Sequence, residues 1–190
     1  MKTIDQLRFE YLEEKKDFEY CFAETMWNKI IRLQKMQNEG KSNSNVYKRL
    51  REALMDDLKK FTDISITPRS SVKAYNRFNE LGLGSIFECT WHHMGSDKIK
   101  KVLGEKGRDI FHYEHLQPHS EYVDNTLIKC TDSHDTYRTL QDYPGVCWIL
   151  KTEDRELTLL GFKSNRIKGG GWRSIYKTAH IQILSILDYN

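Results

Sequence analysis

The first forty residues carry an apolar repeat that predicts one long helix. Apolar side chains recur mostly at spacings of three and four from Ile4 to Leu33, which is the period of one face of an α-helix. Gly40 supplies a stop signal, so we expect a helix over residues 3–38. A helix of this length usually packs against another helix, and residues 46–61, whose leucines also share one face, are the nearest candidate.

Shorter elements follow, first helical and then mixed. A third helix is expected over residues 71–81, and residues 85–92, which are rich in β-formers, are predicted to be a strand. Further helices are expected at residues 96–103, 121–129, 134–140, 152–161 (with Thr152 as its N-cap) and 172–187, and further strands at residues 107–115 and 145–150. A strand over residues 180–186 is the alternative for the last segment. The sequence therefore predicts an α+β fold, with a helical N-terminal region at residues 1–84 and a mixed core at residues 85–190.

The composition is that of an ordinary globular protein. Of the 190 residues, 38% are hydrophobic and 30% are charged, and no apolar run approaches the roughly 20 residues that cross a membrane. The four cysteines are scattered and the N-terminus is charged, so we expect a reduced, cytoplasmic protein without a signal peptide. A net charge of +3 is compatible with a nucleic-acid partner but does not argue strongly for one.

The octapeptide FHYEHLQP, residues 111–118, concentrates more candidate chemistry than any other segment. Glu114 directly precedes His115, and His112 lies three residues before that histidine. A carboxylate can hold a hard cation, and a neighbouring imidazole can take a proton from water. Because successive side chains of a strand point to opposite faces, Glu114 would share its face with His112 unless the strand ends at His115. An edge strand whose polar residues simply meet water is the alternative.

Four blocks of the sequence, in this order, resemble the HNH, or ββα-metal, nucleases of phages and bacteria. They are FHYEHLQP (111–118), WILKTEDREL (148–157), LGFKSNRI (160–167) and WRSIY (172–176). The resemblance covers about residues 108–181. It implies a ββα-metal-like core and a metal-dependent endonuclease, a hydrolase of DNA phosphodiester bonds in a restriction or phage setting. A homodimer formed through the long first helix would suit cleavage of both strands around a two-fold axis, and an arm that spans DNA is the other role open to this helix.

The resemblance implies a role for each matched residue. Glu114 and Asp154 would bind a divalent metal ion, most simply Mg²⁺, with Glu153 as the alternative to Asp154. His115 would act as the general base, and Lys163 would neutralise the scissile phosphate. A basic segment with one aromatic residue can follow a phosphate backbone. The nucleic-acid contacts expected from it are Lys163, Arg166, Lys168, Trp172 and Arg173.

The sequence departs from the family pattern at two positions. The family asparagine has no obvious counterpart, since Asn125 falls in a predicted helix. The family arginine of the third block is Lys163 here, and a lysine lacks the bidentate fork of a guanidinium. These departures keep a second function open, a non-catalytic DNA- or protein-binding factor built on a degenerate nuclease core.

Cysteine and histidine pairs offer a rival metal site. Two pairs have separations that a structural zinc ion could use, and such an ion would point to a small zinc-stabilised interaction protein. The members are Cys89 with His92 or His93, and Cys130 with His134. His119 and His180 have no distinctive neighbours, and we expect both to be exposed.

Overall fold

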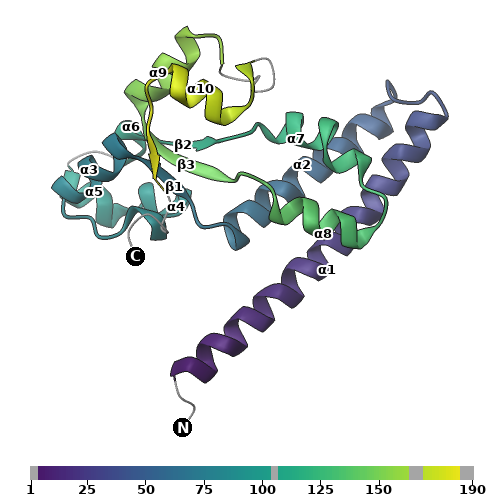
Figure 1. Ribbon diagram of the computed structural model, residues 1–190, viewed down its shortest axis with the longest axis horizontal. Helices are drawn as coiled ribbons and strands as arrows, with labels where there is room; N and C mark the ends of the chain where they lie inside the picture. Colours follow the sequence, from purple (N-terminus) through teal and green to yellow (C-terminus); the bar gives the residue numbers. More distant parts are fainter. Residues whose placement is uncertain (1–3, 104–106, 163–168, 185–190) are drawn as a thin grey trace. The chain divides into compact units, whose positions relative to one another are not determined.

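The computed structural model describes residues 4–103, 107–162 and 169–184 of the chain. The chain divides into two compact units, which Figure 1 shows as a helical part and a part built on a sheet. The helical unit is Met1–Ser65 with His119–Tyr143, and the sheet unit is Ile66–Pro118 with Pro144–Asn190. This division differs from the expected boundary at residue 84, because the sheet recruits residues from before that point and the helical unit recruits residues from after it.

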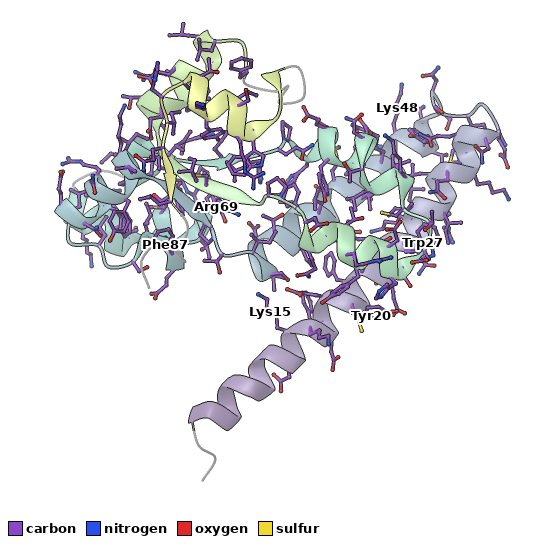
Figure 2. All side chains as sticks on the ribbon, in the orientation of Figure 1. Lys15, Tyr20, Trp27, Lys48, Arg69 and Phe87 are labelled. Carbon is purple, nitrogen blue, oxygen red and sulfur yellow. The ribbon has the colours of Figure 1, made fainter. Side chains whose placement is uncertain are left out.

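The helical unit is built on the long helix that the sequence predicts. Its elements are α1 (Ile4–Asn38), α2 (Asn45–Ser65), α7 (His119–Asn125), the 3₁₀ turn η2 (Leu127–Lys129) and α8 (Ser133–Gln141). Helix α1, on which Figure 2 labels Tyr20 and Trp27, lies against α2 and α8. Its buried face carries Ala23, Met26, Ile30 and Leu33, three or four residues apart. The helical period of this segment is confirmed, and α2 continues to Ser65, beyond the expected end at residue 61.

Polar contacts tie residues 119–143 to the first two helices. The side-chain amide of Gln34 on α1 donates to the carbonyl oxygens of Ile128 and Cys130, both at 2.8 Å. Arg51 on α2 makes two hydrogen bonds of 2.6 Å to the carboxylate of Asp124 on α7. These contacts explain why a segment that follows the second strand in the sequence belongs to the helical unit.

The sheet unit places a short early strand in the interior of its sheet. The elements are β1 (Arg69–Ser71), α3 (Val72–Glu80), η1 (Ile86–Glu88), α4 (Trp91–Met94), α5 (Asp97–Leu103), α6 (Gly107–Ile110), β2 (Phe111–His115), β3 (Val146–Leu150), α9 (Lys151–Leu159), α10 (Trp172–Thr178) and β4 (Ile183–Leu184). Among the described residues the strand order is β2-β3-β1-β4. Strand β2 is antiparallel to β3, β1 is parallel to β3, and β4 is antiparallel to β1.

Helices cover both faces of this sheet (Figure 1). One apolar cluster joins the sheet to α3, η1 and α4, and its buried members include Phe78, Ile86, Met94, Phe111 and Trp148. The other joins the sheet to α9 and α10, and its buried members include Cys147, Ile149, Leu157, Ile175 and Tyr176. We call these sides the α3–α4 face and the α9–α10 face. Consecutive residues of β3 alternate between them, as a strand requires.

Three short segments differ from expectation. The helix that begins at Trp172 ends at Thr178 rather than at residue 187, and β4 falls within the alternative strand at residues 180–186. Residues 85–92 form the 3₁₀ turn η1 and the start of α4 rather than a strand. Ile86 and Phe87 are both buried, which a strand with one covered face does not allow for neighbouring residues. Residues 107–110 are helical, so β2 begins only at Phe111. The α+β fold class is confirmed, and no helix in the described ranges is both long enough and apolar enough to span a bilayer.

Candidate metal centre

Three potential metal ligands meet on the α9–α10 face. His112 and Glu114 lie on this face of β2, because their cross-strand partners are Ile149 and Cys147 of the apolar cluster there. Helix α9 begins directly after β3, so its first turn stands close to the neighbouring strand β2. Asp154 occupies that turn. The antiparallel pair β2–β3 and the helix that follows it therefore assemble the group.

The distances within this group suit a single ion. The Nε2 atom of His112 lies 3.0 Å from Oε2 of Glu114 and 3.8 Å from Oδ1 of Asp154. One ligand atom from each residue lies within 4.8 Å of the other two. Ligand atoms about 2.1 Å from a common ion stand roughly 3 to 4 Å apart, so a small side-chain adjustment would bring all three into range. The side chains are 33%, 12% and 29% exposed in that order, which leaves the group accessible from solvent.

The donor set narrows the choice of ion. Oxygen-only sets suit Mg²⁺, whereas imidazole suits first-row transition metals. One imidazole with two carboxylates fits Mn²⁺ better than the Mg²⁺ that the sequence predicts, although both ions accept carboxylates. Among the described residues this is the one group of three histidine, cysteine or acidic side chains with such spacing.

His115, the expected general base, lies on the other face of β2 from Glu114. The strand does not end before it, since His115 pairs with Val146, and the alternation of side chains therefore continues. Its ring lies 6.4 Å from that of Tyr113, which in turn stands 4.5 Å from the ring of Trp148 on the α3–α4 face. Glu114 and Asp154 come together as expected, but the imidazole beside them belongs to His112.

Glu153, the alternative ligand, lies in the interior instead and is hydrogen-bonded there. Its side chain is buried, and its Oε2 accepts hydrogen bonds from the Ser71 hydroxyl at 2.6 Å and from the Leu150 backbone N–H at 2.9 Å. An acid at the third helical position that reaches back to the N-cap N–H is half of a capping box. Helix α9 therefore begins after Leu150, and Thr152, the expected N-cap, is an exposed residue of the first turn.

The predicted nucleic-acid contacts are only partly described. Lys163, Arg166 and Lys168 lie outside the described residues. Trp172 and Arg173 open α10 and line a cavity of about 630 Å³ in the sheet unit. No sequence pattern adds Arg69, Lys177 or His180 to this set, yet all three line the same cavity. Arg69 reaches it through the pairing of β1 with β3, which no local pattern reveals.

The cysteine–histidine pairs fall in different units. Cys89 belongs to the sheet unit, whereas Cys130 and His134 belong to the helical unit. Burial raises the pKa of the Cys89 thiol to about 11 and also raises the pKa of Cys130. The side chains of His92 and His93 lie outside the described residues. A structural zinc ion here stays a prediction.

Comparison of the chain with protein-family models, with curated proteins and with solved structures gives no match. The case for a function therefore comes from this chain's own residues. Its strongest element is the group of His112 and Glu114 on strand β2 and Asp154 on helix α9.

Proposed function

We propose that this protein is a metal-dependent endonuclease of the ββα-metal type that hydrolyses DNA phosphodiester bonds. The observation that carries the proposal is the convergence of His112, Glu114 and Asp154 at an antiparallel strand pair and the helix directly after it. Two strands followed by a helix are the order that the resemblance to HNH nucleases implies. A basic cavity on the same face of the sheet adds support, because the substrate is a polyanion.

The chain's own residues divide the work in this proposal. A bound divalent cation would stabilise negative charge on the reacting phosphate. Glu114 and Asp154 supply the charge that holds the cation, and His112 supplies a nitrogen ligand. The carboxylate of Glu114 lies 3.0 Å from Nε2 of His112, so one cation could contact both groups. His115 takes no part in binding the cation.

Residues on the same face of the sheet as the centre would bind the nucleic acid. Trp172 and Arg173 are the described members of the predicted contact set, and they line the basic cavity. We assign Lys163, Arg166 and Lys168 to phosphate contacts on sequence grounds alone. DNA is therefore the proposed partner, and a homodimer through α1 remains part of the proposal.

Cation binding and cleavage test the proposal in one set of variants. We expect purified protein to bind Mn²⁺ in calorimetry and to nick supercoiled plasmid faster with Mn²⁺ than with Mg²⁺. Glu114→Gln and Asp154→Asn should each lower the cleavage rate about a hundredfold or more, because several kcal/mol of charge stabilisation are lost. Glu156→Gln, which removes an exposed acid from the same helix, is the matched control and should change neither measurement.

Histidine variants separate the two imidazoles. His112→Ala should weaken Mn²⁺ binding and cleavage together, whereas His115→Ala should leave Mn²⁺ binding unchanged. If His112→Ala slows cleavage at full Mn²⁺ affinity, His112 is a base rather than a ligand. The nuclease proposal would be refuted if the wild-type protein neither bound Mn²⁺ nor nicked plasmid with any divalent ion.

A non-catalytic DNA-binding factor is the second candidate function. One observation favours it: His115 lies on the other face of the strand from Glu114, so the base that the family would use is displaced. Wild-type protein that binds duplex DNA in EDTA, but leaves plasmid intact with Mg²⁺ and with Mn²⁺, would identify this function.

A further inference from the structure

The cavity beside α10 concentrates positive charge. It is lined by Arg69 from β1, by Arg173 and Lys177 from α10, and by His180 after that helix. No carboxylate is among the described residues that line it. In the described part of the chain, its two arginines and its lysine make no ion pair with an acid. By contrast, Arg51 on α2 pairs with an acidic side chain. Such a cavity has uncompensated charge to offer an anion.

Aromatic contacts hold the two arginines in place. The guanidinium carbon of Arg173 lies 4.5 Å from the ring centre of Trp172, and that of Arg69 lies 5.7 Å from the same ring. The Trp172 ring packs edge-on against Tyr176, which is buried in the apolar cluster of this face. Arginines that are positioned before binding lose less conformational entropy when they grip a ligand. Their planar forks match the oxygens of a phosphate group.

His180 adopts a backbone conformation that favours glycine. Its φ is 55°, and it is the only non-glycine residue with a positive φ in the described ranges. The hydrogen bonds His180 N–H to Lys177 O (3.1 Å) and Ile181 N–H to Tyr176 O (2.8 Å) are those of a Schellman motif, in which this position is usually glycine. A strained residue at the rim of a cavity is a pointer to function. Here it places an imidazole, a hydrogen-bond donor, among the cations.

The strand register relates this cavity to the metal centre. Cys147 of β3 pairs with Glu114 of β2 on one side and with Arg69 of β1 on the other, so all three lie on the α9–α10 face. Arg69, labelled in Figure 2, is therefore two strands from Glu114. At the usual strand spacing, their backbones stand roughly 10 Å apart. Because the phosphates of one DNA strand repeat at intervals shorter than this separation, one strand could contact both sites within a few nucleotides.

We propose that the cavity lined by Arg69, Arg173, Lys177 and His180 binds a phosphodiester group of the cleaved DNA strand, within a few nucleotides of the scissile bond. The assignment rests on the proposed nuclease function and adds a second site at which the chain binds its substrate. It makes Arg69 and His180 substrate-binding residues that are separate from the cation ligands.

The test measures DNA binding without cleavage. Fluorescence anisotropy of a labelled duplex in EDTA, over a series of salt concentrations, follows binding alone. We expect Arg69→Ala to weaken binding about tenfold, since a charge-assisted hydrogen bond is lost. The slope of log affinity against log salt should fall by about one. Arg69→Lys should recover the salt slope but only part of the affinity. Arg77→Ala, which removes an exposed arginine of α3, is the matched control and should bind as wild type does.

His180→Gly guards against a simple folding defect. Because glycine accepts the positive φ, this variant should keep or raise the melting temperature while it weakens DNA binding. Arg69→Ala and His180→Gly proteins that bind as tightly as wild type would overturn the cavity assignment. This result would not contradict the proposed nuclease function, which is tested separately by Mn²⁺-dependent nicking.

Two further results would also overturn the assignment. The first is equal weakening by Arg77→Ala, which would mean diffuse charge rather than a site. The second is a combination of two findings: inorganic phosphate binds tightly and requires Arg69, yet Arg69→Ala does not change DNA binding. This combination would mean that the cavity is a site for free phosphate.

Discussion

His119, at the start of α7, is a histidine whose environment opposes its charge. The sequence suggests an exposed side chain, but the ring is half-buried and lies 5.9 Å from that of Tyr143. Burial, with a smaller contribution from the charge of Lys59, lowers the pKa of His119 from 6.5 to about 4. Protonation of this residue therefore favours the unfolded chain.

This shift predicts that the helical unit loses stability in mild acid. A group whose pKa is lower in the folded state contributes its full stability above the unfolded pKa of 6.5, and that contribution is lost as pH falls towards 4. Between pH 7 and pH 5 we expect a loss of about 2 kcal/mol from this residue. Urea unfolding at both pH values measures it. His119→Phe should reduce the pH dependence, and His134→Phe, at an exposed histidine, should not. Equal pH dependence in wild type and His119→Phe would contradict the shift.

At the scale of residues, the sequence is informative where the chemistry is local. The motif EH and the acidic first turn after β3 lead to Glu114 and Asp154. The rule of alternation, applied to a strand that continues through His115, leads to His112. Arg69 was out of reach, because its position depends on β1 pairing with a strand more than seventy residues later.

A buried hydrogen-bond network joins several elements of the sheet unit. Ser71 is the N-cap of α3, where its hydroxyl oxygen accepts from the backbone N–H of Ala74 at 3.0 Å. The same hydroxyl donates to Glu153 of α9, whose carboxylate also accepts from Leu150 at the end of β3. One hydroxyl and one carboxylate thus fix the starts of two helices against the sheet that carries the candidate metal ligands.

We predict that Ser71→Ala destabilises the protein by about 2 kcal/mol. It removes an N-cap hydrogen bond, typically worth about 1 kcal/mol, and one bond to a buried carboxylate. Thr152→Ala should change stability by less than about 0.5 kcal/mol, because Thr152 is exposed and caps nothing. Denaturant midpoints of the two variants make the comparison. A larger loss at Thr152 would show that the start of α9 is controlled by that side chain after all.

At the scale of elements, length decided how well the sequence predicted the fold. The apolar period of α1 and α2 extends over many turns, and both helices are confirmed. Strand β3 is also confirmed, and it could be predicted because β-branched and aromatic residues fill it. Residues 85–92 and 107–110 are too short for a period to distinguish strand from turn or helix, and tertiary packing decides their structure.

The two units of the molecule are both discontinuous in sequence. Residues 119–143 leave the sheet unit after β2, pack with α1 and α2, and return to begin β3. A boundary placed by composition near residue 84 could not capture this, because each unit is completed by contacts between distant segments. The N–H of Leu116 donates to the carbonyl oxygen of Gly145 at 3.1 Å. This hydrogen bond joins the two ends of the inserted segment.

This geometry predicts that the sheet unit folds without its insertion. A chain of residues 66–116, an Asn-Gly turn and residues 145–190 converts β2 and β3 into a tight hairpin, since Asn-Gly is a favoured two-residue hairpin turn. Both apolar clusters of the sheet belong to the retained segments. We expect cooperative thermal unfolding and Mn²⁺ binding close to that of the full chain. Loss of the circular dichroism spectrum would show that the helical unit is required for the sheet to form.

The position of residues 119–143 between β2 and β3 also sets the order in which the two units are synthesised on the ribosome. Every residue of the helical unit has been synthesised before the first residue of β3. Glu114 emerges early, but Asp154 and the α10 arginine are translated after that unit is complete. Under the proposed function, a nascent polypeptide would therefore lack a complete set of cation ligands until the helical unit and then Asp154 have been translated.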